Sequence, residues 1–311
     1  MQVVVTGGAG FVGANLCRVL VEENHHVLVI DDLSTGYRSN LDGVDVDLHV
    51  GSILDVDLLA QVMAGADSIV HLAARGSVPR SLADPVRTDN VNVAGTLNVL
   101  QAARVVDAHV IVASSSSVYG ANPTTPKRED LTPQPMSPYA VSKLAAESYG
   151  LAFQTSYNLD TLVFRFFNIY GPLQSARHPY AAVIPCFISA LLDGEHLKVF
   201  GDGTQSRDFT SVRSVTTILA DAVRRRVTHD RPVNLAFGGN VTLLELIKRL
   251  EGLTGRPAVL DLLEPRVGDV RASQADSTVL RSLFPDATAE TLDDGLQAAL
   301  TWFLETDAKQ S

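Results

Sequence analysis

The sequence predicts an α/β fold, in which a doubly wound parallel sheet carries helices on both faces and a smaller α+β portion follows it. Short runs rich in β-branched residues alternate with stretches of helical periodicity along the first half of the chain. This alternation is typical of a parallel sheet that is buried on both sides. In addition, a glycine-rich turn directly follows the first run, at the place where the first strand of such a sheet meets its first helix.

The order of the elements follows from this pattern. Five strands are expected in the regular part, at Gln2–Thr6, His26–Ile30, Ser68–His71, His109–Ala113 and Thr161–Phe166. Three helices are expected between them, at Gly13–Glu23, Val91–Val106 and Tyr139–Tyr157. A loop rich in Pro, Gly and His runs from Gly171 to Tyr180. Beyond it, helices are expected at Ala182–Leu192, Val212–Arg225 and Leu243–Leu253, and strands at Leu197–Phe200 and Val233–Ala236.

Local signals mark two helix ends and the division of the chain. Thr242 followed by Glu245 predicts a capping box at the start of one helix. The run of three arginines at 224–226 predicts the end of another helix, where basic side chains complement the helix dipole. We expect a first domain of residues 1–168 and 208–237, a smaller second domain of residues 169–207 and 238–305, and a frayed tail of residues 306–311.

Composition and charge exclude several classes of partner. Of the 311 residues, 46% are hydrophobic, and 25 Lys+Arg stand against 35 Asp+Glu, so the net charge is −10. Such a molecule repels nucleic acid and anionic membrane surfaces, and an anionic ligand needs a local cluster of cations or backbone N–H groups. Cys17 and Cys186 have neither disulfide nor metal-site spacing, so we expect no metal and a reduced, cytoplasmic setting. No apolar run approaches the roughly 18 to 20 residues of a membrane span, and no leader peptide is expected.

The glycine-rich turn predicts a dinucleotide site. Residues 6–13 read TGGAGFVG and place Gly7, Gly10 and Gly13 between a strand and a helix. Glycines there let the backbone approach a pyrophosphate at the N-terminus of the helix, as in a Rossmann fold. Asp31 ends the next strand, 18 residues after Gly13, where a carboxylate binds the adenine ribose hydroxyls. Because this carboxylate repels the additional phosphate of NADP, the sequence predicts NAD.

A second group of residues predicts proton transfer. The run of four serines at 114–117 ends a buried strand, and Tyr139 and Lys143 lie four residues apart near the start of a helix, hence on one face of it. A lysine ammonium close to a phenol stabilises the phenolate and lowers a pKa that is about 10 when unperturbed. We therefore expect Tyr139 to remove a hydroxyl proton near neutral pH.

In these motifs the chain resembles the extended short-chain dehydrogenases/reductases, specifically the nucleotide-sugar epimerase and dehydratase group represented by UDP-glucose 4-epimerase. The resemblance covers nearly the whole chain. Its motifs are TGGAGFVG at 6–13, IDDLSTG at 30–36, HLAA at 71–74, NVAGTLNVL at 92–100, SSSSVYG at 114–120, SPYAVSK at 137–143, RFFNIYGP at 165–172 and GDGTQSRDF at 201–209.

The resemblance implies roles for individual residues. Tyr139 resembles the catalytic acid/base, Lys143 the lysine that binds the nicotinamide ribose, and Ser115 the hydroxyl that contacts the reacting sugar. The implied NAD contacts are Gly7, Gly10, Phe11, Val12, Gly13, Asp31, Asp32, Ile53, Leu72, Ala73, Ala74 and Asn92, together with Tyr139 and Lys143. One departure concerns the adenine end, where Ser52 stands at a position that is usually Asp in the family.

The substrate that the resemblance implies is a UDP-sugar. Arg207 and Arg266 are forked donors suited to its diphosphate. Asn168, Val183, Phe200 and Asp269 stand at family positions that contact phosphate, uridine or ribose, and Ser77, Arg80, Ser115, Ser116, Ser117 and Arg177 are expected near the sugar. The loops at 76–81 and 180–185 resemble the group acting on UDP-N-acetylhexosamines, while the serines and Arg177 also suit the carboxylate of UDP-glucuronate; UDP-glucose stays open.

The expected reaction is C4 epimerisation. Dehydratases of the group carry Asp-Glu after the catalytic Ser or Thr, whereas this chain has Ser116 and Ser117, which lack an acid and a base. The alternatives on the same fold are a UDP-glucuronate decarboxylase and a sugar-nucleotide 4,6-dehydratase. A third alternative is a non-catalytic NAD-binding module. Such a module would be expected to have lost the tyrosine, the lysine or the arginines, all of which are present here. By resemblance, the helices at Val91–Val106 and Tyr139–Tyr157 pair two protomers into a homodimer.

Overall fold

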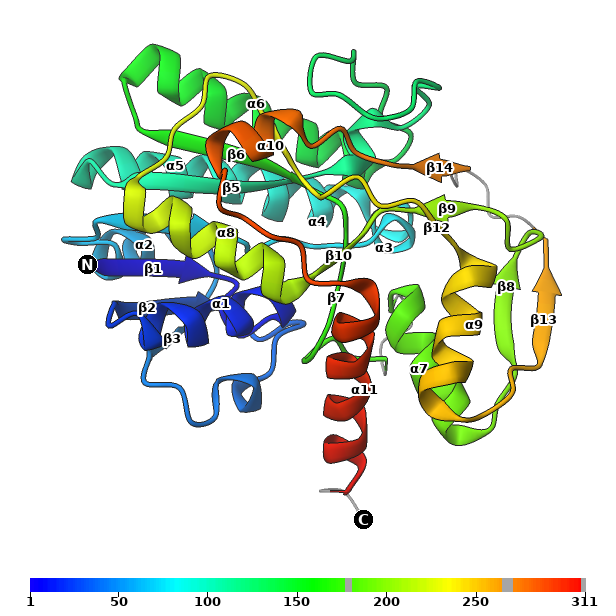
Figure 1. Ribbon diagram of the computed structural model, residues 1–311. Helices are drawn as coiled ribbons and strands as arrows, with labels where there is room; N and C mark the ends of the chain where they lie inside the picture. Colours follow the sequence, from blue (N-terminus) through cyan, green and yellow to red (C-terminus); the bar gives the residue numbers. More distant parts are fainter. Residues whose placement is uncertain (177–180, 265–270, 309–311) are drawn as a thin grey trace.

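The computed structural model describes residues 1–176, 181–264 and 271–308, and its largest element is a seven-stranded sheet (Figure 1). The strands lie in the order β11-β6-β5-β4-β1-β2-β3, and every neighbouring pair is parallel. They are β1 (Gln2–Thr6), β2 (His26–Asp31), β3 (Asp47–Val50), β4 (Ser68–His71), β5 (His109–Ser115), β6 (Thr161–Phe166) and β11 (Val233–Leu235). The direction of winding reverses between β1 and β4, which confirms the doubly wound α/β fold.

Helices cover both faces of this sheet. One face carries α1 (Phe11–Glu22), α8 (Val212–Arg225) and α10 (Thr278–Leu283), and the other carries α2 (Val56–Val62), α5 (Gly95–Val106) and α6 (Pro138–Tyr157). Successive residues of β1 pack into opposite cores: Val3 and Val5 lie against α1 and α8, and Val4 lies against α2 and α5. Side chains alternate across a strand, so a strand buried on both faces is apolar throughout.

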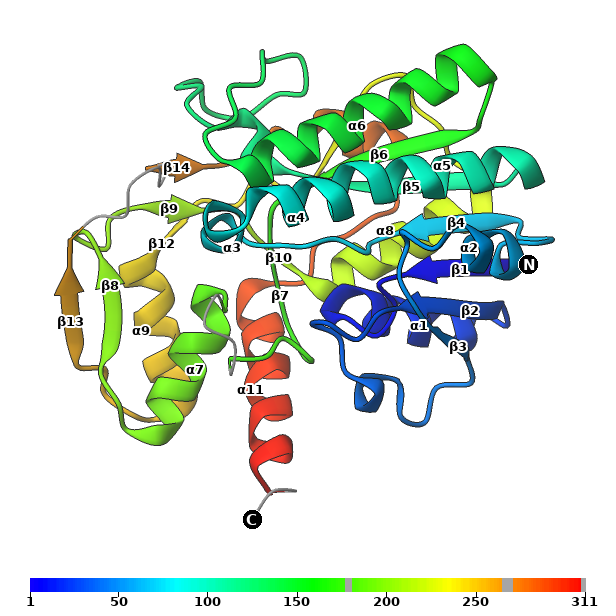
Figure 2. The same ribbon diagram turned by 180° about the vertical axis from the view of Figure 1, so that it is seen from behind.

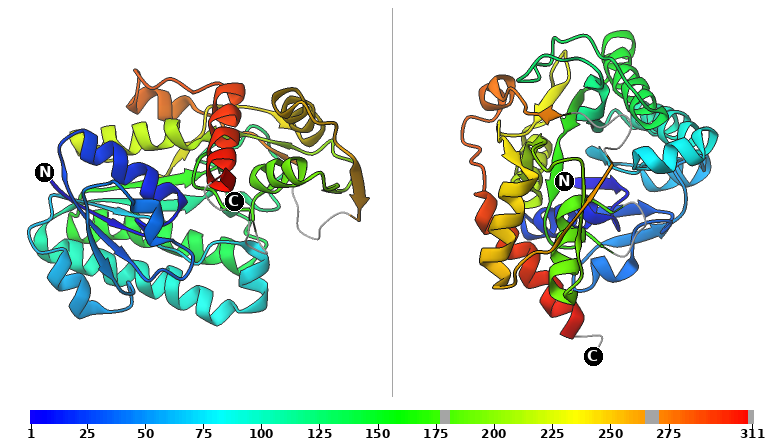
Figure 3. Two further views of the ribbon diagram at one scale, coloured as in Figure 1. Left: turned by 90° about the horizontal axis from the view of Figure 1, so that it is seen from below. Right: turned by 90° about the vertical axis from the view of Figure 1, so that its right-hand side faces the viewer.

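A smaller group of elements lies beyond the carboxyl ends of the strands (Figures 1 and 2). They are β7 (Asn168–Tyr170), α7 (Val183–Asp193), β8 (Leu197–Phe200), β9 (Ser206–Arg207), β10 (Phe209–Ser211), β12 (Val241–Thr242), α9 (Leu243–Thr254), β13 (Leu260–Leu263), β14 (Ala272–Ser273) and α11 (Leu292–Ala308). This group has its own core, in which Ile188, Leu246 and Leu300 are buried. Figure 3 shows that α11 lies on the side of this group that is nearer the sheet.

Several local predictions are confirmed. Thr242 accepts a hydrogen bond from the Glu245 N–H, and the Glu245 carboxylate accepts one from the Thr242 N–H, so the capping box is present. The arginine run ends α8, and its side chains pair with Glu23, Asp221 and Asp160. Within the described residues no helix is long and apolar enough to cross a membrane.

Other elements differ from the prediction. The helix expected at 91–106 begins with a π-helical turn at Asn90–Ala94, before α5. Helix α11 continues to Ala308, two residues past the point where the sequence predicts fraying. The elements that the sequence pattern does not predict are β3, β7, β9, β10, β12, β13, β14, α2, α3 (Val78–Ala83), α4 (Pro85–Asp89), α10 and α11. Most of these are six residues or shorter, too short for a periodic pattern to be recognised.

Candidate functional site

The glycine turn lies where β1 meets α1 and leaves no room for side chains. Gly7 has a φ of +73°, and a Cβ there would lie 2.7 Å from the Ala73 nitrogen. A Cβ on Gly13 would lie 2.2 Å from the Gly7 carbonyl oxygen. Gly10 is the N-cap of α1 and makes no side-chain cap hydrogen bond, so the N–H groups of the first helical turn are available to an anion.

The carboxylate of Asp31 fixes this turn against the end of β2. Its Oδ2 accepts a hydrogen bond from the Ala9 N–H at 3.0 Å, and its Oδ1 accepts one from the Leu33 N–H at 2.8 Å. Burial raises the pKa of Asp31, and the bonds from Leu33 and Ala9 oppose that rise. A carboxylate has about four acceptor positions, so Asp31 retains capacity for ribose hydroxyls.

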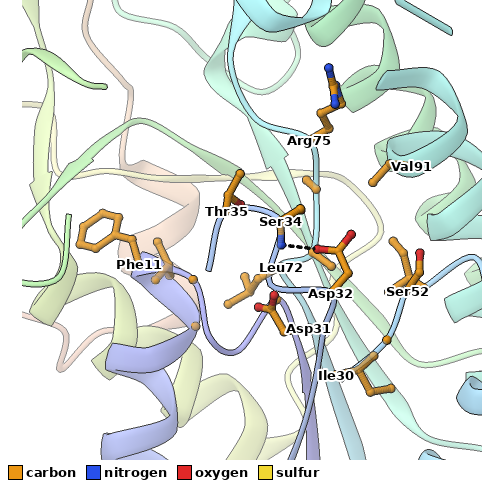
Figure 4. Close-up of a pocket in the computed structure, with 18 of the residues that line it drawn as sticks. Phe11, Ile30, Asp31, Asp32, Ser34, Thr35, Ser52, Leu72, Arg75 and Val91 are labelled. Carbon is orange, nitrogen blue, oxygen red and sulfur yellow. Dashed lines mark hydrogen bonds between the residues drawn. The ribbon is translucent and has the colours of Figure 1, made fainter. Parts of the chain in front are cut away.

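A cavity of about 490 Å³ opens above the turn (Figure 4). Of the residues predicted to contact NAD, it is lined by Gly7, Gly10, Phe11, Val12, Gly13, Asp31, Asp32, Ile53, Leu72, Ala73 and Ala74. Ser34, Thr35 and Ser52 also line it. The structure therefore brings together residues from the ends of β1, β2, β3 and β4.

Three arginines also line this cavity, and none of them is among the residues predicted to contact NAD. They are Arg75, Arg80 and Arg87. Arg80, which is expected near the sugar, also lines this cavity. Arg75 pairs at 3.6 Å with Asp84, and its Nε is buried without a hydrogen-bond partner. Cationic groups at this wall complement the negative charge of a pyrophosphate.

Asn92 lies in the π-helical turn and joins this cavity to α6. Its Oδ1 accepts a hydrogen bond from the Arg75 N–H at 2.7 Å, and its Nδ2 donates to the Arg75 carbonyl and to the Ser142 hydroxyl. Ser142 in turn donates to the Tyr139 carbonyl at 2.8 Å. The side chain predicted to contact the cofactor thus holds the backbone of the cavity wall, and π-helical turns often occur at functional sites.

The predicted catalytic residues meet at the carboxyl end of β5. Tyr139 is half-buried in the first turn of α6, and its hydroxyl forms a hydrogen bond with that of Ser115. Ser117 donates to the Ser115 oxygen through both its N–H, at 3.2 Å, and its hydroxyl, at 2.9 Å. The hydroxyl proton of Ser115 is therefore available to Tyr139. Lys143, one turn further along, donates from Nζ to the Ala113 carbonyl at 2.8 Å.

The pKa of Tyr139 differs from the sequence prediction. Burial raises it, and the hydrogen bond from Ser115 opposes that rise. Burial also lowers the pKa of Lys143 to about 8. The expectation of a lysine-lowered phenol pKa was therefore wrong for this structure, because the sequence analysis did not include the desolvation of either group.

A second cavity, of about 450 Å³, lies in the smaller group of elements. Of the predicted substrate residues, Asn168, Val183, Phe200 and Arg207 line it. Asn168 is held by a hydrogen bond from its Nδ2 to the Asp208 carbonyl. Arg177, Arg266 and Asp269 lie outside the described residues.

The loop predicted to approach the sugar has an unusual backbone. Ser77 has a φ of +104°, a conformation that non-glycine residues seldom adopt, and its hydroxyl accepts a hydrogen bond from the Arg80 N–H as the N-cap of α3. Strained backbone of this kind clusters at ligand sites. Ser116 and Ser117, which are also expected near the sugar, lie in the 3₁₀ turn Ser116–Tyr119 after β5.

These features define a Rossmann protein with a dinucleotide cavity at the carboxyl edge of its sheet and a second cavity in an appended group of elements. Residues 3–236 match the NAD dependent epimerase/dehydratase family. The chain belongs to this family, and its cofactor is NAD. The side-chain-free glycine turn, the free N–H groups of α1 and the unpaired Arg75 Nε fit the pyrophosphate of that cofactor, and Asp31 fits its ribose.

Relatives match over their full length. The chain is 34% identical to a UDP-glucose 4-epimerase of Mycolicibacterium smegmatis, over 97% of this chain and 98% of that protein. Among solved structures, a UDP-N-acetylglucosamine 4-epimerase from Methanobrevibacter ruminantium, in complex with UDP-N-acetylmuramic acid, is 34% identical with a TM-score of 0.93 and covers 98% of each chain. A UDP-glucuronic acid 4-epimerase from Bacillus cereus, in complex with UDP-glucuronic acid and NAD, is 28% identical with a TM-score of 0.89, over 98% of this chain and all of that one.

Replacing Gly13 with Ala should abolish tight binding of NAD. The new methyl group would meet the Gly7 carbonyl oxygen, and the turn would have to move away from the pyrophosphate position. We expect the dissociation constant for NADH, measured by fluorescence titration, to rise at least about tenfold. Gly252→Ala is the matched control, because nothing lies within 4 Å of the new Cβ. Equal affinity of both variants and the wild type would contradict this role of the turn.

The buried Lys143 should make stability depend on pH. Its pKa is about 8 in the folded protein and 10.5 ordinarily, so the unfolded chain binds more protons between these values and the free energy of unfolding rises with pH there. In Lys143→Met, the gain in unfolding free energy from pH 7 to pH 10 should be smaller by about 2 to 3 kcal/mol. Urea unfolding at both pH values measures this, with the exposed Lys198→Met as control. The same gain in all three proteins would disprove the shift.

Proposed function

We propose that this protein epimerises C4 of a UDP-sugar, with Tyr139 as the acid/base. The observation that carries the proposal is the hydrogen-bonded pair of Tyr139 and Ser115, which stands at the carboxyl end of β5 in a family of NAD-dependent sugar-nucleotide enzymes. The three relatives described above are 4-epimerases by name and differ in the sugar named. Their names support the reaction and leave UDP-N-acetylglucosamine, UDP-glucuronate and UDP-glucose as candidates.

The residues divide the reaction as follows. Tyr139 takes the proton of the C4 hydroxyl, and Ser115 holds that hydroxyl in place. Bound NAD would supply a hydride acceptor for C4 and the donor for the return step, so no external oxidant would be needed. The 4-keto sugar rotates within the site, so that its opposite face receives the returning hydrogen. Tyr139 then gives the proton back to the C4 oxygen, and Lys143 binds the nicotinamide ribose.

The side chains around Ser115 support epimerisation over dehydration. Elimination of water needs an acid and a base in addition to the tyrosine, and the two residues after Ser115 are serines. The carboxylate of Glu147 lies nearby, but both of its oxygens are bound to Arg165, at 2.6 and 3.0 Å. A carboxylate paired in this way is not available to a substrate. For the same reason, Glu147 is not available as the additional acid or base that dehydration needs.

The cavity lined by Asn168, Val183, Phe200 and Arg207 is our candidate for the nucleotide half of the substrate. Arg207 offers a forked cation for the diphosphate, and Phe200 offers an apolar ring at the same cavity. The proposed arrangement places a small cationic site on a molecule with a net charge of −10.

Tyr139→Phe should abolish epimerisation while leaving NAD bound, because the phenol proton is lost and the ring is kept. The experiment incubates wild type and variant with UDP-glucose, UDP-N-acetylglucosamine and UDP-glucuronate, without added reductant, and identifies the products by NMR. We expect the wild type to invert C4 of at least one sugar and the variant to be at least about 10³-fold slower. Release of CO₂ from UDP-glucuronate would instead show a decarboxylase, and an unaltered rate in the variant would refute the role of Tyr139.

We also propose a homodimer formed through α5 and α6. Apolar side chains stand exposed on this side of the molecule: Val105 is 82% exposed on α5, Val141 is 53% exposed on α6 and Val86 is 69% exposed on the adjacent α4. Pairing two such surfaces would remove them from water. Sedimentation velocity should give twice the mass of 33.3 kDa, and Val141→Glu should shift the protein to the monomer. A monomeric wild type at micromolar concentration would disprove the dimer.

A further inference from the structure

Three side chains on one face of α6 contact three successive residues of β5. Tyr139, Lys143 and Glu147 are spaced by four residues, so they follow one another along the helix. The Tyr139 hydroxyl bonds Ser115, and Lys143 Nζ bonds the Ala113 carbonyl. The Ser114 hydroxyl donates to Glu147 Oε2 at 2.8 Å. These contacts determine how far α6 lies along β5, and hence where the phenol meets Ser115.

Glu147 is fixed by a buried ion pair with Arg165 on β6. Arg165 Nη2 donates to Oε1 at 2.6 Å and Arg165 Nε donates to Oε2 at 3.0 Å, in a bidentate geometry. Both side chains are less than 5% exposed. Arg165 is the direct partner of Ser114 in the β5–β6 register, so Ser114, Glu147 and Arg165 join two strands and the helix at one point.

The ion pair also reaches the 3₁₀ turn that carries the serines. The Arg165 guanidinium lies 4.7 Å from the centre of the Tyr119 ring, and Arg165 Nη1 donates to the Glu129 carbonyl. The Tyr119 hydroxyl donates to Asn234 Oδ1 on β11 at 2.6 Å. The turn after Ser115 therefore contacts Arg165 of β6 and is also held to β11 by the hydrogen bond between Tyr119 and Asn234.

A requirement for stability does not explain this ion pair. Burying two charges costs desolvation energy, and apolar residues of similar volume often serve the fold as well or better. The hydrogen bonds of Tyr139 and Lys143 must change partners when the proposed substrate and cofactor bind. Among the three contacts between α6 and β5, only the contact of Glu147 does not have to change partners when these ligands bind. It is the contact able to keep the register constant through the reaction.

We propose that Glu147 and Arg165 are positioning residues, which set the register of α6 on β5 and thereby place the Tyr139 hydroxyl at Ser115. The inference rests on the proposed roles of Tyr139 and Ser115. It adds that the rate of the chemical step depends on an ion pair that touches neither substrate nor cofactor. Ser114 transmits the position of that pair to the neighbouring Ser115.

The test replaces the whole pair by apolar residues, because removing one partner would leave a buried charge and prevent folding. We expect Glu147→Leu/Arg165→Met to fold and to keep the NADH dissociation constant and the KM for the sugar nucleotide within about twofold. Its kcat should fall at least about tenfold, since misplacing a catalytic group is costly. The rise of kcat with pH should move to higher pH, because Tyr139 loses the Ser115 hydrogen bond that lowers its pKa. If the pair had only a structural role, the double variant would change neither kcat nor its pH dependence.

Two further variants complete the test. Arg249→Met/Asp293→Leu is the matched control, because it removes an exposed ion pair between α9 and α11 and should leave kcat unchanged. Ser114→Ala removes the 2.8 Å bond to Glu147 and a longer one, of 3.5 Å, to the Lys143 carbonyl, and it leaves the ion pair in place. It decides the matter if the double variant does not fold: a kcat reduced about threefold or more supports the proposal, and an unchanged kcat overturns it.

The outcomes for the proposed function and for this inference are separable. If Tyr139→Phe retains activity, the proposed function has failed. If Tyr139→Phe is inactive while the folded Glu147→Leu/Arg165→Met variant keeps both its kcat and its pH profile, the positioning role alone has failed.

Discussion

The close approach of Gly7 and Gly13 is the constraint on which the cofactor site depends. The space between the Gly7 carbonyl and the Gly13 Cα admits no Cβ, and this contact sets the direction in which α1 leaves β1. The direction of α1 in turn aims its free N–H groups over the edge of the sheet. Asp31 fixes the same turn from the side of β2. Backbone geometry, rather than a set of flexible side chains, therefore defines the anion position.

The electrostatics of the molecule are local. A chain with a net charge of −10 holds two anionic partners in our account, and it does so without a broad basic surface. For the cofactor, backbone N–H groups act together with Arg75, Arg80 and Arg87 at one wall. In the proposed substrate cavity Arg207 has the corresponding position. Short-range contacts of this kind are less screened by salt than long-range attraction.

The fold and the cofactor cavity were largely predictable because their signals are local in sequence. Gly7, Gly10, Gly13 and Asp31 lie within one strand–helix–strand unit, and the strands are apolar on both faces. The sequence did not reveal the arginines of the cavity wall, because Arg75 and Arg87 reach it from loops and short helices without periodicity. Nor did it reveal the link between Ser114, Glu147 and Arg165, which exists only once the β5–β6 register is known. The pKa of Tyr139 was misjudged because burial was not considered.

The number of residues in the π-helical turn at Asn90–Ala94 determines which side chains face the site and which face the core. It places Asn92 so that one amide holds the backbone of Arg75 and the hydroxyl of Ser142, while the helix after it buries Val99 and Leu100. A regular α-helix turns about 100° per residue, so deleting one residue of this turn would force a choice between the two. Either the amide would lose its partners, or α5 would expose its apolar face. Insertions and deletions that a surface loop tolerates would therefore disrupt this segment.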